Sequence, residues 1–349
     1  YRLYLPGLYV PASTHEATRL GYDAGADGWV GKSASGRLAS GALGVPLAAD
    51  GDGTAEQRWL ETAELATRQS IAGARWMWTS LEPHLMLDYF AIGDDTDHLF
   101  WGLVSPDSPA YDAARAERVQ RVRAHAWSLV DARIAAVHAL AREGGGAVVL
   151  TGDHGMRAYW RRFRPNVALA RAGLLHVGES GRPDASRSRA ISPNGYWVSV
   201  NRASWRDGTV ATASARAVID SVVQALREVR DSAGRQVVSA IFRSAQHDTL
   251  GLGGPVGGDV YFELAPGYYY DAGATGPVTD DLPSARGGHG YPSVSPDMQT
   301  VLCVNGPGFG PRRIAQARTI DVTPTVLDWL GVAPARTVRG RSLLRDLRE

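Results

Sequence analysis

The sequence predicts an α/β fold in which helices cover both faces of a mainly parallel sheet. Two short apolar runs, residues 85–92 and 147–152, have the length and composition of buried strands. Between them, residues 109–143 contain no glycine and no proline after the first residue, and apolar side chains recur every three or four positions. This spacing predicts one long helix. Strand, helix and strand in this order are typical of two parallel strands joined by a crossover.

The N-terminal part of the chain predicts less regular structure. Residues 1–54 are rich in Gly, Ala, Ser and Pro and have no sustained period, which indicates loops and short strands. Residues 56–74 have apolar positions at helical spacing, with acidic residues early and arginines late, so we expect a helix there. We therefore expect residues 1–80 to form an irregular cap or inserted region with one helix, and residues 81–349 to belong to the α/β domain.

The same criteria predict further elements toward the C-terminus. They are two helices, at residues 214–230 and 323–330, and one strand, at residues 299–304.

Composition excludes several classes of function. The 37 Lys and Arg residues nearly balance the 36 Asp and Glu residues, giving a net charge of +1, so we expect no nucleic-acid partner. The single cysteine, Cys303, excludes an intrachain disulfide and a Cys-rich zinc module, and we expect it to fill space in the buried strand at 299–304. No apolar run approaches the ~18 residues of a membrane span. We expect a soluble protein, and the compartment stays open, secretion and the periplasm included.

Acidic and histidine side chains follow both predicted strands. Asp94 and His98 are four residues apart and would share one face of a helical turn, and Asp153 and His154 come directly after the second strand. His289 lies between glycines and is a third candidate. Carboxylate and imidazole groups are ligands for zinc, manganese or iron. Because the carboxyl ends of parallel strands meet at one edge of a sheet, these side chains predict a shared metal site.

Each pattern also has a structural explanation. An Asp and a His four apart are often a solvated helix face, an Asp-His pair often caps a loop, and glycines around a histidine can simply form a turn. Asp95 and Asp97 lie in the same acidic run but would point away from the face of Asp94. We expect them to support the ligands or to face solvent.

Three ordered motifs resemble the type I phosphodiesterase and nucleotide pyrophosphatase family of the alkaline phosphatase superfamily. They are FAIGDDTDHLFWG, TGDHGM and the closing run GGHGYPSVSPDMQTVLCVNGPGFG with RTIDVTPTVLDWLGV. The resemblance extends from about Leu85 to the C-terminus. It implies an alkaline phosphatase-like fold and a metal-dependent phosphoester hydrolase that acts on small-molecule phosphodiesters or pyrophosphates.

The resemblance also implies two divalent metal ions, Zn²⁺ or alternatively Mn²⁺. One ion would be held by Asp94, His98 and His289. The other would be held by Asp153 and His154, together with an Asp and a nucleophilic Thr or Ser near the N-terminus of the family.

The nucleophile has no clear counterpart in this sequence. No buried strand ending in Asp and Thr occurs upstream of Leu85, so we expect the nucleophile segment to lie outside this chain. Ser13 and Thr14 are the nearest hydroxyl candidates. Two alternatives stay open: a phosphomonoesterase of the same superfamily, and a metal-binding relative that is catalytically silent. The sequence does not fix the oligomeric state.

Overall fold

The computed structural model describes four stretches of the chain: residues 33–193, 195–244, 257–291 and 295–348. These residues form two compact units. Unit 1 comprises residues 33–99, Ala114–Gly155 and 299–348, and unit 2 comprises Phe100–Ala113 and the described residues from Met156 to Met298. The domain boundary expected at residue 80 stays a prediction.

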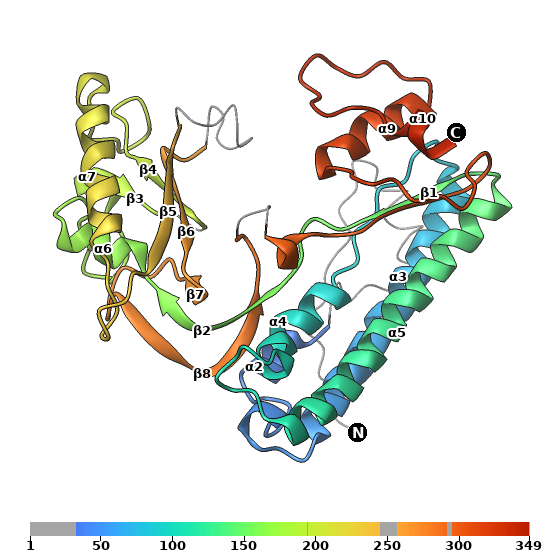
Figure 1. Ribbon diagram of the computed structural model, residues 1–349, viewed down its shortest axis with the longest axis horizontal. Coiled ribbons are helices and arrows are strands. Elements are labelled where there is room, and N and C mark those ends of the chain that lie inside the picture. The colour runs from blue at the N-terminus through green and yellow to red at the C-terminus, as the bar shows by residue number, and fades with distance from the viewer. Residues whose placement is uncertain (1–32, 194, 245–256, 292–294, 349) are drawn as a thin grey trace. The chain divides into compact units, whose positions relative to one another are not determined.

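Unit 1 is mainly helical and unit 2 mainly β (Figure 1). Unit 1 contains α2 (Ser35–Ala39), α3 (Thr54–Leu81), the first part of α4 (Ile92–Val104), α5 (Ala113–Glu143), β1 (Val148–Thr151), β9 (Leu302–Asn305), α9 (Val322–Trp329) and α10 (Leu344–Arg348). Unit 2 contains β2 (Arg157–Phe163), α6 (Pro165–Arg171), β3 (Ala190–Ile191), β4 (Trp197–Val200), α7 (Ala215–Arg227), β5 (Val238–Arg243), β6 (Val260–Leu264), β7 (Gly267–Tyr270) and β8 (Thr279–Gly288).

The two long helices of unit 1, α3 and α5, lie side by side (Figure 1). A buried arginine of α5, Arg133, donates to Ser70 Oγ of α3 (2.8 Å) and to Asp88 Oδ2 (2.6 Å). The α5 helix ends at the predicted glycines, where the Gly146 N–H donates to the Ala141 carbonyl. Both helices are confirmed. The end of α5 is the predicted one, whereas α3 extends to Leu81, beyond the end expected at residue 74.

A buried carboxyl group in α3 makes unit 1 sensitive to pH. Glu56 is 1% exposed, and its Oε1 accepts from the Leu47 N–H at 2.7 Å. Its Oε2 has no hydrogen-bond partner among the described residues. Burial raises the pKa of Glu56 above its usual 4.5 and outweighs the opposing effect of the Leu47 hydrogen bond.

In the unfolded chain Glu56 ionises near pH 4.5, whereas in the folded protein it ionises only at a higher pH. We therefore expect the free energy of unfolding to fall as the pH rises from 4.5 through the raised pKa of the folded state. Glu56→Gln removes the buried charge, so at pH 8 the variant should be about 1 kcal/mol more stable than the wild type. The difference should vanish below pH 4. Urea unfolding at both pH values measures it, with the exposed Glu61→Gln of the same helix as control. An advantage that is equal at both pH values would contradict the assignment.

Unit 2 contains two sheets. One has the order β7-β2-β8, in which β2 runs parallel to β7 and antiparallel to β8. The other has the order β3-β4-β6-β5, and its neighbouring strands are antiparallel. The α7 helix packs on this second sheet and buries Val218, Val222 and Leu226 against it (Figure 1). The predicted helix at 214–230 is confirmed as α7.

The fold is mixed α/β, but the expected mainly parallel layout is not what the described strands form. Residues 85–92 do not make the predicted strand: residues 85–90 are irregular and α4 begins at Ile92. Leu87 is 87% exposed and Tyr89 69% exposed. A strand needs a partner for its backbone groups, and β1 pairs with β9 rather than with this segment. The apolar run was therefore a misleading signal for a strand.

The strands β1 and β9 pair in antiparallel fashion, with Leu150 opposite Cys303. Both strands and the helix α9 confirm the elements predicted at 147–152, 299–304 and 323–330. The burial expected for Cys303 is wrong, because its side chain is exposed. Among the described residues, the pair β1-β9 forms a sheet of two strands.

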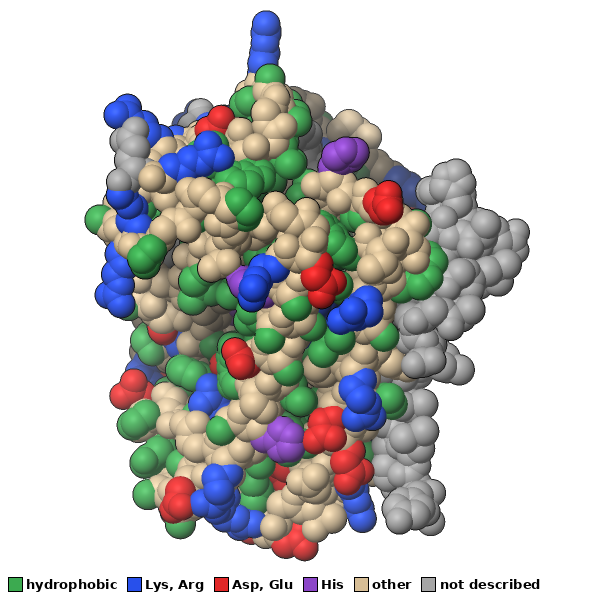
Figure 2. All heavy atoms as spheres, turned by 90° about the vertical axis from the view of Figure 1, so that its right-hand side faces the viewer, with side chains coloured by type: hydrophobic (Ala, Val, Ile, Leu, Met, Phe, Trp, Pro, Cys, Tyr) green, Lys and Arg blue, Asp and Glu red, His purple; other side chains and the backbone are tan. Residues whose placement is uncertain are grey.

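The surface carries mixed charge. On the face that Figure 2 shows, acidic and basic side chains are interspersed with apolar ones and do not gather by sign. None of the helices in the described part of the chain has the length and apolar character needed to cross a membrane.

Candidate functional site

The first turns of α4 position Asp94 and His98. Because the two residues are four apart on a helix, their side chains lie on one face, and Asp94 Oδ1 is 3.4 Å from His98 Nε2. Thr96 anchors the same turn, since its hydroxyl donates to the Ile92 carbonyl. The helical turn predicted for this acidic run is confirmed.

The turn after β1 positions Asp153 and His154. Gly152 allows this turn to pass close to Thr300, whose Oγ1 would lie 2.0 Å from a Cβ at this position. The His154 ring is oriented by its own neighbour, because Nδ1 lies 3.0 Å from the Gly155 carbonyl and donates to it. Nε2 then carries the lone pair in the neutral ring. That atom is 3.4 Å from Asp153 Oδ2 and 3.9 Å from Asp94 Oδ1.

Three pairs of ligand atoms thus lie close together in unit 1, and they link Asp94 to His98, Asp94 to His154 and His154 to Asp153. Bonds of about 2.1 Å in a tetrahedral zinc site place ligand atoms about 3.4 Å apart, close to the separations found here. Asp94 Oδ1 is buried and has no hydrogen-bond partner among the described residues. Within the same part of the chain, no arginine forms an ion pair with Asp94 or Asp153. Carboxylate and imidazole groups of this kind are suitable ligands for a divalent cation.

The neighbouring acids point to other partners. Asp95 Oδ2 accepts from the Ser33 hydroxyl at 2.8 Å. Asp97 is buried and accepts two hydrogen bonds from Arg123, at 2.7 and 2.9 Å. Burial raises the pKa of Asp97 and outweighs the opposing effect of the Arg123 guanidinium. Both aspartates turn away from the face of Asp94, as the helical spacing predicts.

Tyr89 lies close enough to this site for the carboxylates of Asp94, Asp153 and Asp95 to act on its phenol, and the sequence patterns did not select it. Desolvation, followed by these carboxylates, raises the pKa of the phenol. Its place in an irregular segment, where we expected a strand, explains why periodicity did not reveal it.

The remaining candidates lie outside unit 1 or outside the described residues. His289 belongs to unit 2, where it follows β8 directly, and its role as a ligand stays a prediction. Ser13 and Thr14 lie outside the described residues.

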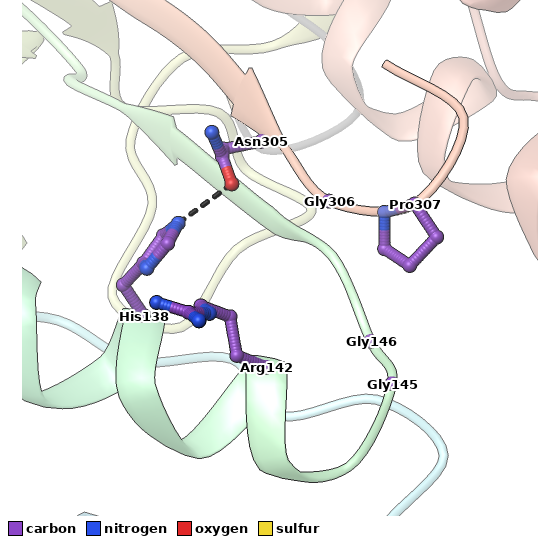
Figure 3. A pocket seen from close by; sticks show the side chains of 7 residues that line it. All are labelled: His138, Arg142, Gly145, Gly146, Asn305, Gly306 and Pro307. Atoms are coloured by element: carbon purple, nitrogen blue, oxygen red, sulfur yellow. Dashed lines mark hydrogen bonds between the residues drawn. The ribbon is translucent and has the colours of Figure 1, made fainter.

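A pocket of about 410 Å³ lies at the other end of β1 (Figure 3). It is lined by His138, Arg142, Gly145, Gly146, Asn305, Gly306 and Pro307. His138 points toward Asn305 and makes a 2.6 Å hydrogen bond to its Oδ1, which ties α5 to β9. The lining contains no carboxylate, so this pocket is not a second candidate for the metal site.

Comparison with known proteins identifies the family. A model of the type I phosphodiesterase/nucleotide pyrophosphatase family matches residues 2–292. The match starts earlier than the resemblance at Leu85 and ends at residue 292, inside the closing run that begins at Gly287, so the likeness extends further toward the N-terminus than the motifs indicated. No curated protein matches the chain. The family match covers most of the sequence and includes all five predicted ligand positions, and the chain belongs to the type I phosphodiesterase/nucleotide pyrophosphatase family of phosphoric ester hydrolases.

Proposed function

We propose that the full-length protein hydrolyses small-molecule phosphodiesters or pyrophosphates with two divalent metal ions, Zn²⁺ or alternatively Mn²⁺, and with a Thr or Ser nucleophile that is not among the residues assigned here. Five side chains hold the ions: Asp94, His98, Asp153, His154 and His289. The observation that carries this proposal is the Asp94 carboxylate, whose buried Oδ1 faces two imidazole Nε2 atoms at 3.4 and 3.9 Å without a hydrogen bond.

The alternative explanation of this arrangement is an ordinary ion pair between Asp94 and a protonated histidine. An ion pair would align a ring N–H with the carboxylate and give Asp94 Oδ1 a hydrogen bond. Asp94 Oδ1 has no hydrogen bond among the described residues, which argues against an ordinary ion pair. His154 also favours a metal site, because its Nδ1 donates to the Gly155 carbonyl and its Nε2 faces two carboxylates. Engagement of one ring nitrogen by a carbonyl is typical of a metal-ligating histidine.

Bound ions would lower the pKa of a hydroxyl group, hold a nonbridging phosphate oxygen and stabilise the leaving oxygen. The chain's own residues supply geometry and charge. Asp94 and His98 are fixed by the helix backbone of α4, and His154 is fixed by its hydrogen bond to Gly155. The Tyr89 phenol lies near the carboxylates and can donate to a phosphate oxygen.

The test is a turnover screen of the metal-loaded protein. A nitrophenyl phosphodiester, the matching monoester and a dinucleoside pyrophosphate are compared at equal concentration, with Zn²⁺ or Mn²⁺ present. We expect the diester or the pyrophosphate to be the best substrate, and removal of metal with a chelator to lower its turnover by at least about 100-fold. Addition of the ion should restore the rate.

Three other outcomes would contradict the proposal in different ways. Preference for the monoester would favour the phosphomonoesterase. Binding of metal ions with no turnover would favour the silent relative. Turnover that survives the chelator, with no metal found by elemental analysis, would exclude the metal centre itself.

A further inference from the structure

The loop that carries His289 is built against a cluster of tyrosine rings within unit 2. β8 ends at Gly288, which pairs with Arg157 of β2, and His289 follows directly. The ring centroids of neighbouring tyrosines lie 4.4 to 6.0 Å apart. The tyrosine cluster comprises Tyr159, Tyr196, Tyr269, Tyr270 and Tyr291.

Both glycines beside His289 are required by the approach of these rings. A Cβ at position 288 would lie 2.6 Å from the Tyr269 ring. A Cβ at position 290 would lie 2.5 Å from the Tyr196 ring, and Gly290 has a φ of +90° that other residues rarely adopt. The glycines therefore do more than form a turn, because they let the backbone of His289 lie directly on the tyrosine cluster.

Hydrogen bonds hold this backbone on both sides. The Tyr196 hydroxyl donates to the His289 carbonyl at 3.1 Å. Two residues on, buried Tyr291 donates to the Tyr268 carbonyl at 2.5 Å, and the Arg157 guanidinium lies 4.7 Å from the Tyr291 ring centroid. Arg157 is itself fixed by two hydrogen bonds to Asp297. The loop is thus fixed by a connected set of contacts.

We propose that Tyr196 is a positioning residue that fixes the His289 backbone and so presents the imidazole to a metal ion. The inference rests on the proposed function, in which His289 is a ligand. Its physical basis is preorganisation: a ligand whose backbone is already ordered loses less conformational entropy when the ion binds. Groups that orient a metal ligand without touching the metal commonly change metal affinity.

Tyr196→Phe tests the proposal, because it keeps the ring and removes only the donor. In the full chain we expect the affinity for Co²⁺ at the site of Asp94, His98 and His289, followed by its visible absorption, to fall about fivefold to tenfold. Amide hydrogen exchange at residues 289–291 of the metal-free protein should become faster by a similar factor. Gly290→Ala, which pushes the backbone away from the Tyr196 ring, should have a larger effect on both measurements.

The matched control is Tyr268→Phe. It removes a buried phenol of the same unit that donates to Asp231 Oδ2 at 2.7 Å and not to the loop, while the backbone carbonyl that Tyr291 uses remains. Metal affinity and loop exchange should equal those of the wild type. If Tyr196→Phe exchanges faster but binds metal as the wild type does, Tyr196 only stabilises the fold and the proposal is wrong. If the wild type binds no divalent ion, the proposed function fails, whereas the exchange data still report whether Tyr196 orders the loop.

Discussion

Asp94→Asn should lower kcat/KM for a phosphodiester by about 1000-fold, which corresponds to about 4 kcal/mol of transition-state stabilisation. The amide keeps the shape of the side chain but removes the negative charge that faces His98 and His154. It also removes the buried oxygen that lacks a hydrogen bond. The measurement is steady-state turnover with the metal content of each preparation confirmed by elemental analysis.

The matched control for this variant is Asp95→Asn, one position along the same helix. Asp95 accepts from Ser33 and does not face the histidines, so we expect a loss of less than about tenfold. Equal losses in the two variants, at equal metal content, would show that Asp94 is not the carboxylate that holds the ion.

Asp88→Asn should destabilise unit 1 by about 3 kcal/mol in urea unfolding. The variant leaves the guanidinium of Arg133 without its anion, and the side chain of Arg133 is only 3% exposed. Ser70 Oγ remains as a neutral acceptor for the Arg133 Nε, so the charge itself is not compensated. Because Asp88 lies shortly before α4, loss of its ion pair with Arg133 should also make the segment that leads to Asp94 less ordered.

Glu117→Gln on α5 is the control for Asp88→Asn. Glu117 pairs with Arg121 at 2.6 Å, but both side chains are largely exposed. We expect its removal to change the unfolding free energy by less than about 0.5 kcal/mol, because water screens and replaces such pairs. A loss at Asp88 no larger than this would contradict the importance of burial for Arg133.

The sequence predicts those parts of the fold that depend on local rules. The helices α3, α5 and α7 follow from apolar periods, and the end of α5 follows from the glycines after it. The common face of Asp94 and His98 follows from helical spacing alone. The segment 85–92 fails because apolar composition reports a preference for burial and not the presence of a pairing strand.

The β8 strand shows the opposite error, since it was not predicted. It contains Pro283, two consecutive aspartates and terminal glycines, so it lacks the alternation that marks a strand. Its register depends on partners far away in sequence, where Asp281 and Asp280 pair with Arg161 and Arg162 of β2. Such long-range ion pairs leave no periodic trace in either segment.

Some features of the candidate site could likewise be predicted from the sequence, and others could not. Residue type, helical spacing, position after the predicted strands and the family resemblance selected Asp94, His98, Asp153 and His154 as candidates, although the strand expected before Asp94 does not form. The orientation of the His154 ring depends on the Gly155 carbonyl, and the unsatisfied Asp94 oxygen depends on burial; both arise from backbone geometry that residue identities do not encode.

The exposed thiol of Cys303 offers one defined position for attaching a spectroscopic label. It is the single cysteine of the chain, and it lies opposite Leu150, three residues before Asp153. A nitroxide attached through this sulfur would be anchored about 10 Å along the strand from Asp153. Paramagnetic Mn²⁺ entering the site would then broaden the nitroxide spectrum, so occupancy by the metal can be followed by electron paramagnetic resonance without any substrate.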